Sequence, residues 1–184
     1  MNTAAIKTPK ESFVTMTELV MPNDTNMLFN VMGGKMMHWM DVVSAIAAQR
    51  HSNRIVVTAS VDTISFAAPI KLGYVVTLQA KVTRAFTTSM EVQIEVWGED
   101  IPNNKKFKSN SAFFTFVALD ENGNKVEIPE ITPETEEEKE LYNSALQRRQ
   151  LRLVLAGKMK AEDAPTMLEP INFDDEEDCE SCKL

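Results

Sequence analysis

Residues 35–50 form the segment that most constrains the fold, because apolar residues cover almost its whole circumference. The length of the segment and its alanines favour a helix over a strand. A helix that is apolar on nearly every side is predicted to be buried on nearly every side, unlike a surface helix with one apolar stripe. The rest of the domain must therefore surround this helix.

The chain after this helix predicts an antiparallel sheet. Residues 90–97 alternate cleanly, with apolar side chains on one face and Glu91, Gln93 and Glu95 on the other, as in a sheet with one wet face. No helical pattern separates the strands, which argues against parallel crossover units. A first strand is expected at residues 12–20, and Asn122-Gly123 is a hairpin signal. Segments rich in β-branched and aromatic residues predict the other strands: 55–61, 75–82, 90–97 and 111–117.

A second helix is predicted from Thr132, as the capping hydroxyl, and Pro133, in the first position, to about Ala156. The fold class is therefore α+β, with an antiparallel sheet wrapped around a long central helix and a C-terminal helix added. At 184 residues the chain suits one domain. We predict an N-terminal extension (1–11), the domain with its C-terminal helix (12–157) and an acidic disordered tail (158–184). A single sheet around one helix leaves open edges, so dimerisation is expected.

The net charge of -8 is concentrated in the tail. From Ala161 onward nine acidic residues stand against one base, Lys183, so the body is neutral. An acidic tail repels phosphate backbones, which argues against nucleic-acid binding. The sequence has no apolar run long enough to span a membrane and no secretory leader, so we expect a cytoplasmic protein.

Both cysteines, Cys179 and Cys182, lie in the tail, so no disulfide framework holds the fold. Their spacing is that of half a zinc knuckle or of a redox pair. No second cysteine pair or nearby histidine completes a site, and the surrounding acids oppose thiolate formation. We expect no metal site in one chain.

Asp41 is the most informative single residue, because it lies in the middle of the apolar helix. Burying a carboxylate without a compensating donor is costly. Either a structural hydrogen bond satisfies it, or it is a general base or nucleophile held in a dry cleft. His38 lies three residues earlier, a spacing that makes the two side chains neighbours. We interpret His38 and Asp41 as a structural polar pair, and His51 as a helix-end residue.

Gly33 and Gly34 precede the helix directly. A helix N-terminus offers unpaired amides and the positive end of a dipole, and glycine lets a ligand approach the backbone closely. Such a site suits the developing oxyanion of a thioester, although paired glycines also serve simply as a turn. Asp41 lies about 10 Å further along the axis, so a second residue near the helix start would be needed.

The run from Met21 to Asp41 resembles the signature of hotdog-fold acyl-CoA thioesterases of the cytosolic long-chain acyl-CoA hydrolase type. The resemblance covers roughly residues 14–155, with further blocks in family order. These blocks are 47–51, 57–62, 66, 69–73, 88–92, 110–116 and 133–136. The resemblance implies a hotdog fold and the hydrolysis of acyl-CoA to free fatty acid and CoA, in fatty acid metabolism, without metal or cofactor.

The catalytic pair of that family maps onto Asn30 and Asp41, contributed by different hotdog units. The resemblance therefore implies an active site at a homodimer interface, in a trimer of such dimers, a hexamer. Asp41 would activate water or attack the carbonyl itself, and Asn30 would orient the water or thioester. The amides of Gly34 and Lys35 would polarise the carbonyl beside Gly33.

The CoA moiety needs basic and hydroxyl groups at strand ends, for which Arg84 and Ser89 are candidates. Thr58 and Ser60 lie on the strand expected to line the pantetheine channel. Arg148 and Arg152 are further phosphate candidates, but with Arg149 they also complement a helix C-terminus and solvate its face.

Two other functions remain open. A hotdog dehydratase or hydratase would act on acyl thioesters without cleaving them, but would need a histidine in the loop before the central helix. A non-catalytic acyl-CoA-binding scaffold would dock partners through the acidic tail and bind without turnover.

Overall fold

The computed structural model describes residues 6–62, 64 and 66–164. It divides into two compact units, residues 1–132 and residues 133–184, which are described in turn. Most of the predicted acidic tail, with Cys179 and Cys182, lies outside the described residues.

The central helix of the first unit is α2, Gly33–Ser52. It extends the predicted helix, residues 35–50, by two residues at each end. Asn53 stops the helix in the left-handed conformation, with φ 52°, and its amide donates to the carbonyl of Gln49. Asparagine adopts this conformation at little cost, which makes it an effective helix terminator. The predicted central helix is confirmed.

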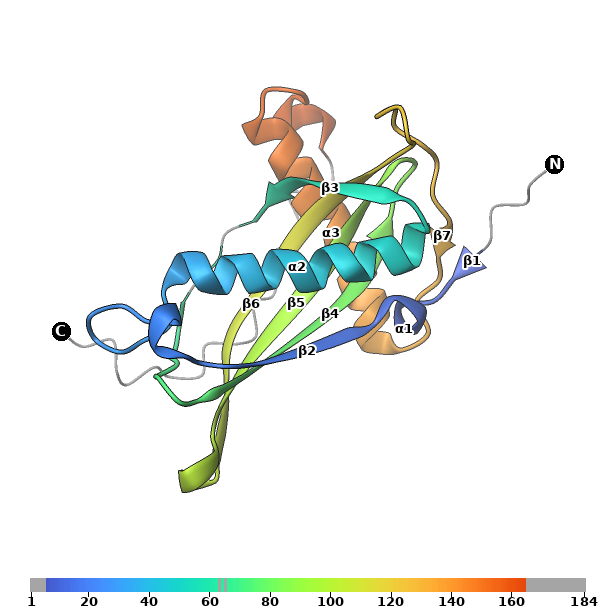
Figure 1. Ribbon diagram of the computed structural model, residues 1–184. Helices are drawn as coiled ribbons and strands as arrows, with labels where there is room; N and C mark the ends of the chain where they lie inside the picture. Colours follow the sequence, from blue (N-terminus) through green and yellow to red (C-terminus); the bar gives the residue numbers. More distant parts are fainter. Residues whose placement is uncertain (1–5, 63, 65, 165–184) are drawn as a thin grey trace. The chain divides into compact units, whose positions relative to one another are not determined.

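A five-stranded antiparallel sheet curls around α2 in the order β2-β4-β5-β6-β3 (Figure 1). The predicted hotdog architecture is therefore confirmed. Strands β2 and β3 form its two edges. The strands are β2 (Val14–Leu19), β3 (Ile55–Val61), β4 (Val75–Ala85), β5 (Ser89–Asp100) and β6 (Lys105–Leu119).

Shorter elements complete the first unit. The first predicted strand is preceded by α1, Pro9–Ser12, and by β1, Ile6–Lys7, which pairs in parallel with β7, Glu130–Ile131. The 3-10 turns η1 (Pro22–Asp24) and η2 (Ile101–Asn103) follow β2 and β5. The Asn122-Gly123 turn closes only one bridge, between Leu119 and Lys125.

The alternation in β5 determines which face of the sheet meets the helix. Val92, Ile94 and Val96 are fully buried. On the opposite face Gln93 and Glu95 are half-buried, but Glu91, which was predicted to face water with them, is fully buried. Neighbouring strands present the same pattern on the buried face, for example Leu78 on β4. A strand's alternate residues share a face, so this register builds a continuous apolar layer against α2.

The prediction that α2 is buried on nearly all sides is wrong for the single chain. One face is buried against the sheet, including Met36, Met40, Val43 and Ala47. Residues on the opposite face are half-buried or exposed: His38, Asp41, Val42, Ala45 and Gln49. The sheet covers one side of the helix, so the apolar residues of the other side need a different cover.

The second unit contains α3, Glu136–Leu155, and the 3-10 turn η3, Ala161–Asp163. The helix begins three residues later than predicted, because Thr135, not Thr132, is its N-cap. The Thr135 hydroxyl accepts from the Glu138 amide at 3.2 Å, and the Glu138 carboxylate accepts from the Thr135 amide at 3.2 Å. This reciprocal capping box satisfies two donors, which a lone hydroxyl before proline does not. Among the described residues, no helix is long and apolar enough to cross a membrane.

His51 is fully buried at the end of α2, where its Nε2 lies 2.9 Å from the carbonyl oxygen of Pro129. Burial lowers the pKa of His51, and the nearby Lys7 ammonium adds to the effect, against the opposing hydrogen bond to Pro129 and the charge of Glu11. The folded state therefore favours neutral imidazole. The contribution of neutral His51 to the stability of the fold is fully present above the pKa of the unfolded state, and it is lost as pH falls below that pKa.

We expect the free energy of unfolding to fall between pH 6.5 and 5.5 by up to about 1.4 kcal/mol, the limit for one proton. Urea denaturation at both pH values measures it. In the His51→Gln variant, which is expected to be less stable at pH 7.5, this pH-dependent loss should disappear. An unchanged pH slope in the variant would assign the loss to other groups.

Candidate active site

The start of α2 leaves two backbone donors outside the helix's own hydrogen bonds. The first intrahelical bonds come from the amides of Lys35 and Met36, which both donate to the Met32 carbonyl at 3.0 Å. Gly33 and Gly34 precede these bonds, and the N-cap residue Met32 supplies no side-chain cap. A Cβ at Gly34 would meet nothing within 4 Å. Open space therefore adjoins the Gly34 backbone, whereas the predicted Lys35 amide is already paired.

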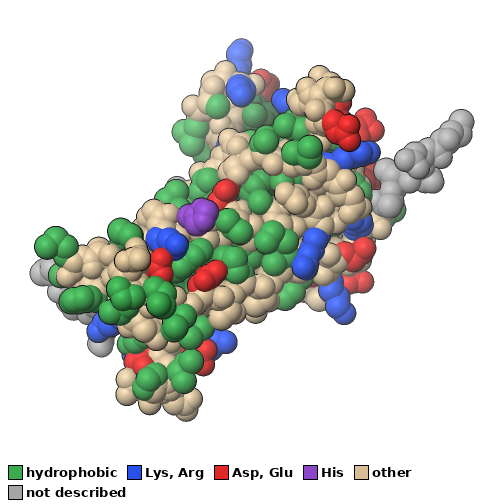
Figure 2. Space-filling view, viewed as in Figure 1, with side chains coloured by type: hydrophobic (Ala, Val, Ile, Leu, Met, Phe, Trp, Pro, Cys, Tyr) green, Lys and Arg blue, Asp and Glu red, His purple; other side chains and the backbone are tan. Residues whose placement is uncertain are grey.

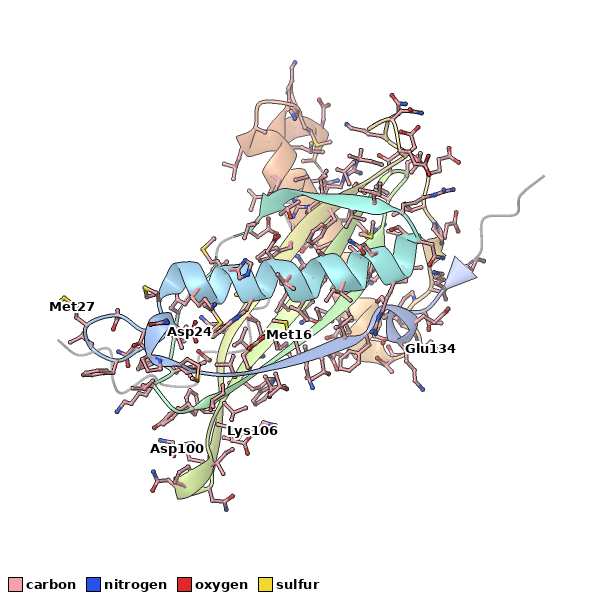
Figure 3. The ribbon with its side chains drawn as sticks, viewed as in Figure 1. Met16, Asp24, Met27, Asp100, Lys106 and Glu134 are labelled. Atoms are coloured by element: carbon pink, nitrogen blue, oxygen red, sulfur yellow. The ribbon has the colours of Figure 1, made fainter. Side chains whose placement is uncertain are left out.

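The Lys35 side chain is also engaged. Its ammonium lies 3.1 Å from Asp24 Oδ1 and 5.2 Å from the centroid of the Trp39 ring. Asp24 Oδ2 accepts from the Met21 amide at 3.0 Å. This hydrogen bond and then Lys35 hold the pKa of Asp24 below its ordinary value, against a smaller opposing effect of burial. Figure 3 shows Asp24 beside the start of α2, where the ion pair ties the preceding turn to the helix.

Asp41 projects from the α2 face that the sheet leaves open. Its Oδ1 accepts a 2.7 Å hydrogen bond from the Thr58 hydroxyl on the edge strand β3. The carboxylate is half-buried rather than sealed, and the polar pairing is with Thr58, not with the predicted partner His38. Thr58 thus orients one oxygen of Asp41.

The loop between η1 and α2 carries Asn26 and Asn30 on a rigid framework. Asn26 Oδ1 accepts from the amides of Leu28 and Asn30 at 2.9 and 3.2 Å. The Asn30 carbonyl accepts from the Asn26 amide at 2.8 Å. Phe29 has φ 58°, a left-handed conformation that is unusual for an aromatic residue.

The tip of this loop is apolar and exposed. Met27, Leu28 and Phe29 are 97%, 77% and 65% exposed. The Met27 side chain extends from the outer end of the loop (Figure 3). Figure 2 shows hydrophobic side chains gathered at this end of the first unit. An exposed apolar run of this kind indicates an interaction surface.

A pocket of about 280 Å³ opens beside the first turn of α2. Its lining is mainly apolar and comes from four parts of the chain: the loop, the start of α2, the segment that precedes β4, and the strand β6. Ser109 Oγ, almost fully buried, donates to the Ala68 carbonyl at 2.8 Å and fixes one wall. The lining residues are Asn30, Val31, Gly33, Met36, Phe66, Ala68, Pro69, Ile70, Ser109 and Asn110.

The structure brings together some predicted site residues and separates others. Thr58 is hydrogen-bonded to Asp41, and Asn30 and Gly33 both line the pocket. Ser60 follows an irregularity in β3 that begins at Thr58. Ser89 opens β5, and Arg84 lies on β4 with its guanidinium 5.6 Å from the Phe86 ring centroid. β5 and β6 separate β4 from β3, so Arg84 lies about 14 Å or more from Thr58 across the sheet.

Arg148 and Arg152 belong to α3 in the second unit. Arg148 donates to Ser144 Oγ at 2.9 Å and to the Leu141 carbonyl at 3.2 Å, both on its own helix. These contacts favour the interpretation that Arg148 serves its own helix, α3, rather than a phosphate group. Among residues 6–62, 64 and 66–164, no group of three or more potential metal ligands gathers.

The sequence did not identify Ile70, Ser109 or Asn110 as site residues, although Ile70 and Asn110 lie within the family blocks 69–73 and 110–116. The Ser109–Ala68 hydrogen bond joins residues 41 positions apart. Each of these residues occupies an ordinary loop or strand position, so no local pattern marks the pocket. Only the folded topology brings the segment before β4 next to β6.

The curled sheet and the long central helix define the class of hotdog-fold proteins. Residues 30–103 match the model of the thioesterase superfamily. The chain is 43% identical over 148 residues to YkhA of Bacillus subtilis (strain 168), named an uncharacterized acyl-CoA thioester hydrolase, covering 80% of this chain and 86% of that one. The chain therefore belongs to the acyl-CoA thioester hydrolases of the thioesterase superfamily.

Two solved structures extend the comparison. An acyl-CoA hydrolase from Staphylococcus aureus, in complex with butyryl-CoA, CoA and CoA disulfide, is 36% identical with a TM-score of 0.76, covering 83% of this chain and 95% of that one. An apo-hexameric acyl-CoA thioesterase is 35% identical with a TM-score of 0.81, covering 84% and 99%. Variants of the S. aureus protein that replace an aspartate, an asparagine or a threonine by alanine have also been solved.

A mammalian relative is longer. The chain is 42% identical over 147 residues to acyl-coenzyme A thioesterase 11 of Mus musculus, covering 80% of this chain but only 25% of that protein.

Proposed function

We propose that the protein hydrolyses acyl-CoA thioesters to a carboxylic acid and CoA in the cytoplasm, without metal or cofactor. The observation that carries this proposal is the Asp41–Thr58 pair on the open face of α2, in a chain of the acyl-CoA thioester hydrolase family. A carboxylate held by one hydrogen bond, yet accessible, suits a general base or nucleophile.

The active site is formed by two copies of the chain. Asp41 lies about 10 Å along the axis from Gly34 of the same helix, whereas catalytic groups must approach within about 3 Å of the reacting atoms. One chain therefore cannot bring its own amides and its own carboxylate to one carbonyl. A second copy, with its α2 antiparallel to the first, places its Asp41 beside the first copy's Gly33 and Gly34.

The edge strand β3 is the surface through which the copies pair. Ile55, Val57 and Val61 on this open edge are exposed apolar residues. Unpaired strand edges readily add another strand, and a two-fold axis pairs identical edges. Edge pairing at β3 covers the bare side of α2 and brings both copies of Asp41 to the interface. A hexamer built from three such dimers is consistent with the hexameric relative.

The reaction follows from these positions. Asp41 takes a proton from water, and the water oxygen attacks the thioester carbonyl carbon. Alternatively the carboxylate attacks this carbon directly, and water then hydrolyses the resulting mixed anhydride and restores Asp41. The Gly33 and Gly34 amides stabilise the oxyanion. The C–S bond then breaks, and the CoA thiolate takes up a proton on leaving. Arg84, Ser89 and Ser60 are proposed to contact CoA, with Arg148 and Arg152 as further phosphate candidates.

Incubating the purified protein with acyl-CoAs and a thiol reagent tests the activity. Release of free CoA is expected. Binding of acyl-CoA without thiol release would instead indicate a scaffold, and hydration of an enoyl-CoA without thiol release would indicate a hydratase.

Spacing identifies a second candidate for the catalytic asparagine. The asparagine and aspartate replaced in the S. aureus variants are 15 positions apart, and the aspartate and threonine are 17 apart. In this chain Asp41 and Thr58 are 17 apart, and Asn26 lies 15 positions before Asp41, whereas Asn30 lies 11 before it. The spacing thus favours Asn26 over the predicted Asn30.

We expect Asn26→Ala to lower kcat by about 10²-fold, the typical loss for one positioned donor. Asn30→Ala, in the same loop, is expected to lower kcat by less than about 10-fold. Steady-state kinetics of both variants, with circular dichroism to check folding, measure the difference. The reverse order of effects would assign the role to Asn30.

A further inference from the structure

We propose that the pocket beside the first turn of α2 holds the acyl chain and limits the length that is fully bound. The inference rests on the proposed thioesterase function. Gly33 both lines the pocket and carries one of the amides assigned to the thioester oxygen. A thioester bound at these amides therefore starts its acyl chain beside the pocket.

The chemistry of the lining favours an alkyl chain over the polar pantetheine arm. Met36 and Ile70 are almost fully buried and form the inner wall. The Ser109 hydroxyl is engaged with the Ala68 carbonyl and with Asn110 Oδ1. These polar groups of one wall thus bind one another, and most of the lining surface left to a ligand is apolar.

Phe66 forms the outer wall. A Cβ at Gly33 would lie 3.6 and 3.8 Å from Cζ and Cε2 of Phe66, so the edge of the ring lies close to Gly33. The ring therefore borders the path of a chain that enters there. Phe66 is about half exposed in the single chain.

The volume of the pocket sets the length of acyl chain that it can hold. With about 30 Å³ for each group of the size of a water molecule, a volume of about 280 Å³ holds about nine methylene-sized groups. The pocket then accommodates acyl chains of up to about nine carbons, and longer chains extend past Phe66. kcat/KM is expected to rise from acetyl-CoA to octanoyl-CoA and then to level off.

Ala68→Leu tests the assignment, because its three extra carbons would fill the space that a medium-length chain needs. We expect the ratio of kcat/KM for octanoyl-CoA to that for butyryl-CoA to fall by at least about 10-fold, since even one methylene is worth that much in an apolar pocket. Thermal unfolding checks that the variant folds.

Phe66→Ala is the second variant, because an exposed side chain can be removed without unfolding the protein. It is expected to lower the same ratio about 3-fold or more. Phe13→Ala, a change of similar exposure outside the pocket lining, is the matched control and should leave the ratio unchanged.

Wild-type ratios in both Ala68→Leu and Phe66→Ala would overturn the acyl pocket while leaving thioesterase activity intact. Absence of CoA release by the wild-type protein with every acyl-CoA would overturn the proposed function itself.

Discussion

Replacement of Asp41 by asparagine is expected to lower kcat by about 10³-fold with little change in KM. Asparagine keeps the shape of the side chain and an oxygen that accepts from the Thr58 hydroxyl, but it cannot take a proton from water. The loss should therefore fall on the chemical step. Steady-state hydrolysis of a medium-chain acyl-CoA, followed by thiol release, measures it.

Glu127→Gln provides the control, because Glu127 is an exposed carboxylate in the loop after β6. This variant should retain wild-type kinetics. Unfolding curves should show that Asp41→Asn is at least as stable as the wild type, since it removes a half-buried charge. A kcat within 10-fold of wild type for Asp41→Asn would exclude Asp41 as base or nucleophile.

Replacement of Val57 by lysine should separate the two copies of the chain in the dimer and thereby abolish activity. Val57 is 44% exposed on the open β3 edge, so the single chain accommodates a lysine there. A two-fold interface brings both copies of the substituted position together, and like charges opposed across paired strands destabilise the pairing. We expect association to weaken by about 100-fold or more.

Sedimentation velocity measures the assembly, and activity should fall in proportion to the lost dimer. Ile101→Lys is the matched control, because Ile101 is exposed at the turn between β5 and β6. An active Val57→Lys dimer would show that the copies pair through another surface.

The fold was predictable because its signals are local. The alternation of β5 and the β-branched runs of β3, β4 and β6 mark strands, and the alanine-rich apolar segment marks α2. The sequence carries two signals for the start of α3, Thr132-Pro133 and the reciprocal Thr135–Glu138 pair, and both are strong helix starts, so the sequence alone does not decide between them.

The burial of α2 was not predictable from one chain, because apolar character indicates that a surface will be covered, not what covers it. Asp41 and Thr58 were each identified, but their hydrogen bond joins segments that only the fold brings together. The same holds for the pocket, whose walls come from residues on four separate segments.

Mixing two inactive variants tests the shared active site most directly. The Asp41→Asn chain retains Asn26, and the Asn26→Ala chain retains Asp41. A dimer that contains one chain of each kind therefore has one complete active site. Co-expression, with half of the dimers mixed, should restore about a quarter of wild-type activity. If the mixture is no more active than the two variants alone, each site lies within one chain and the account is contradicted.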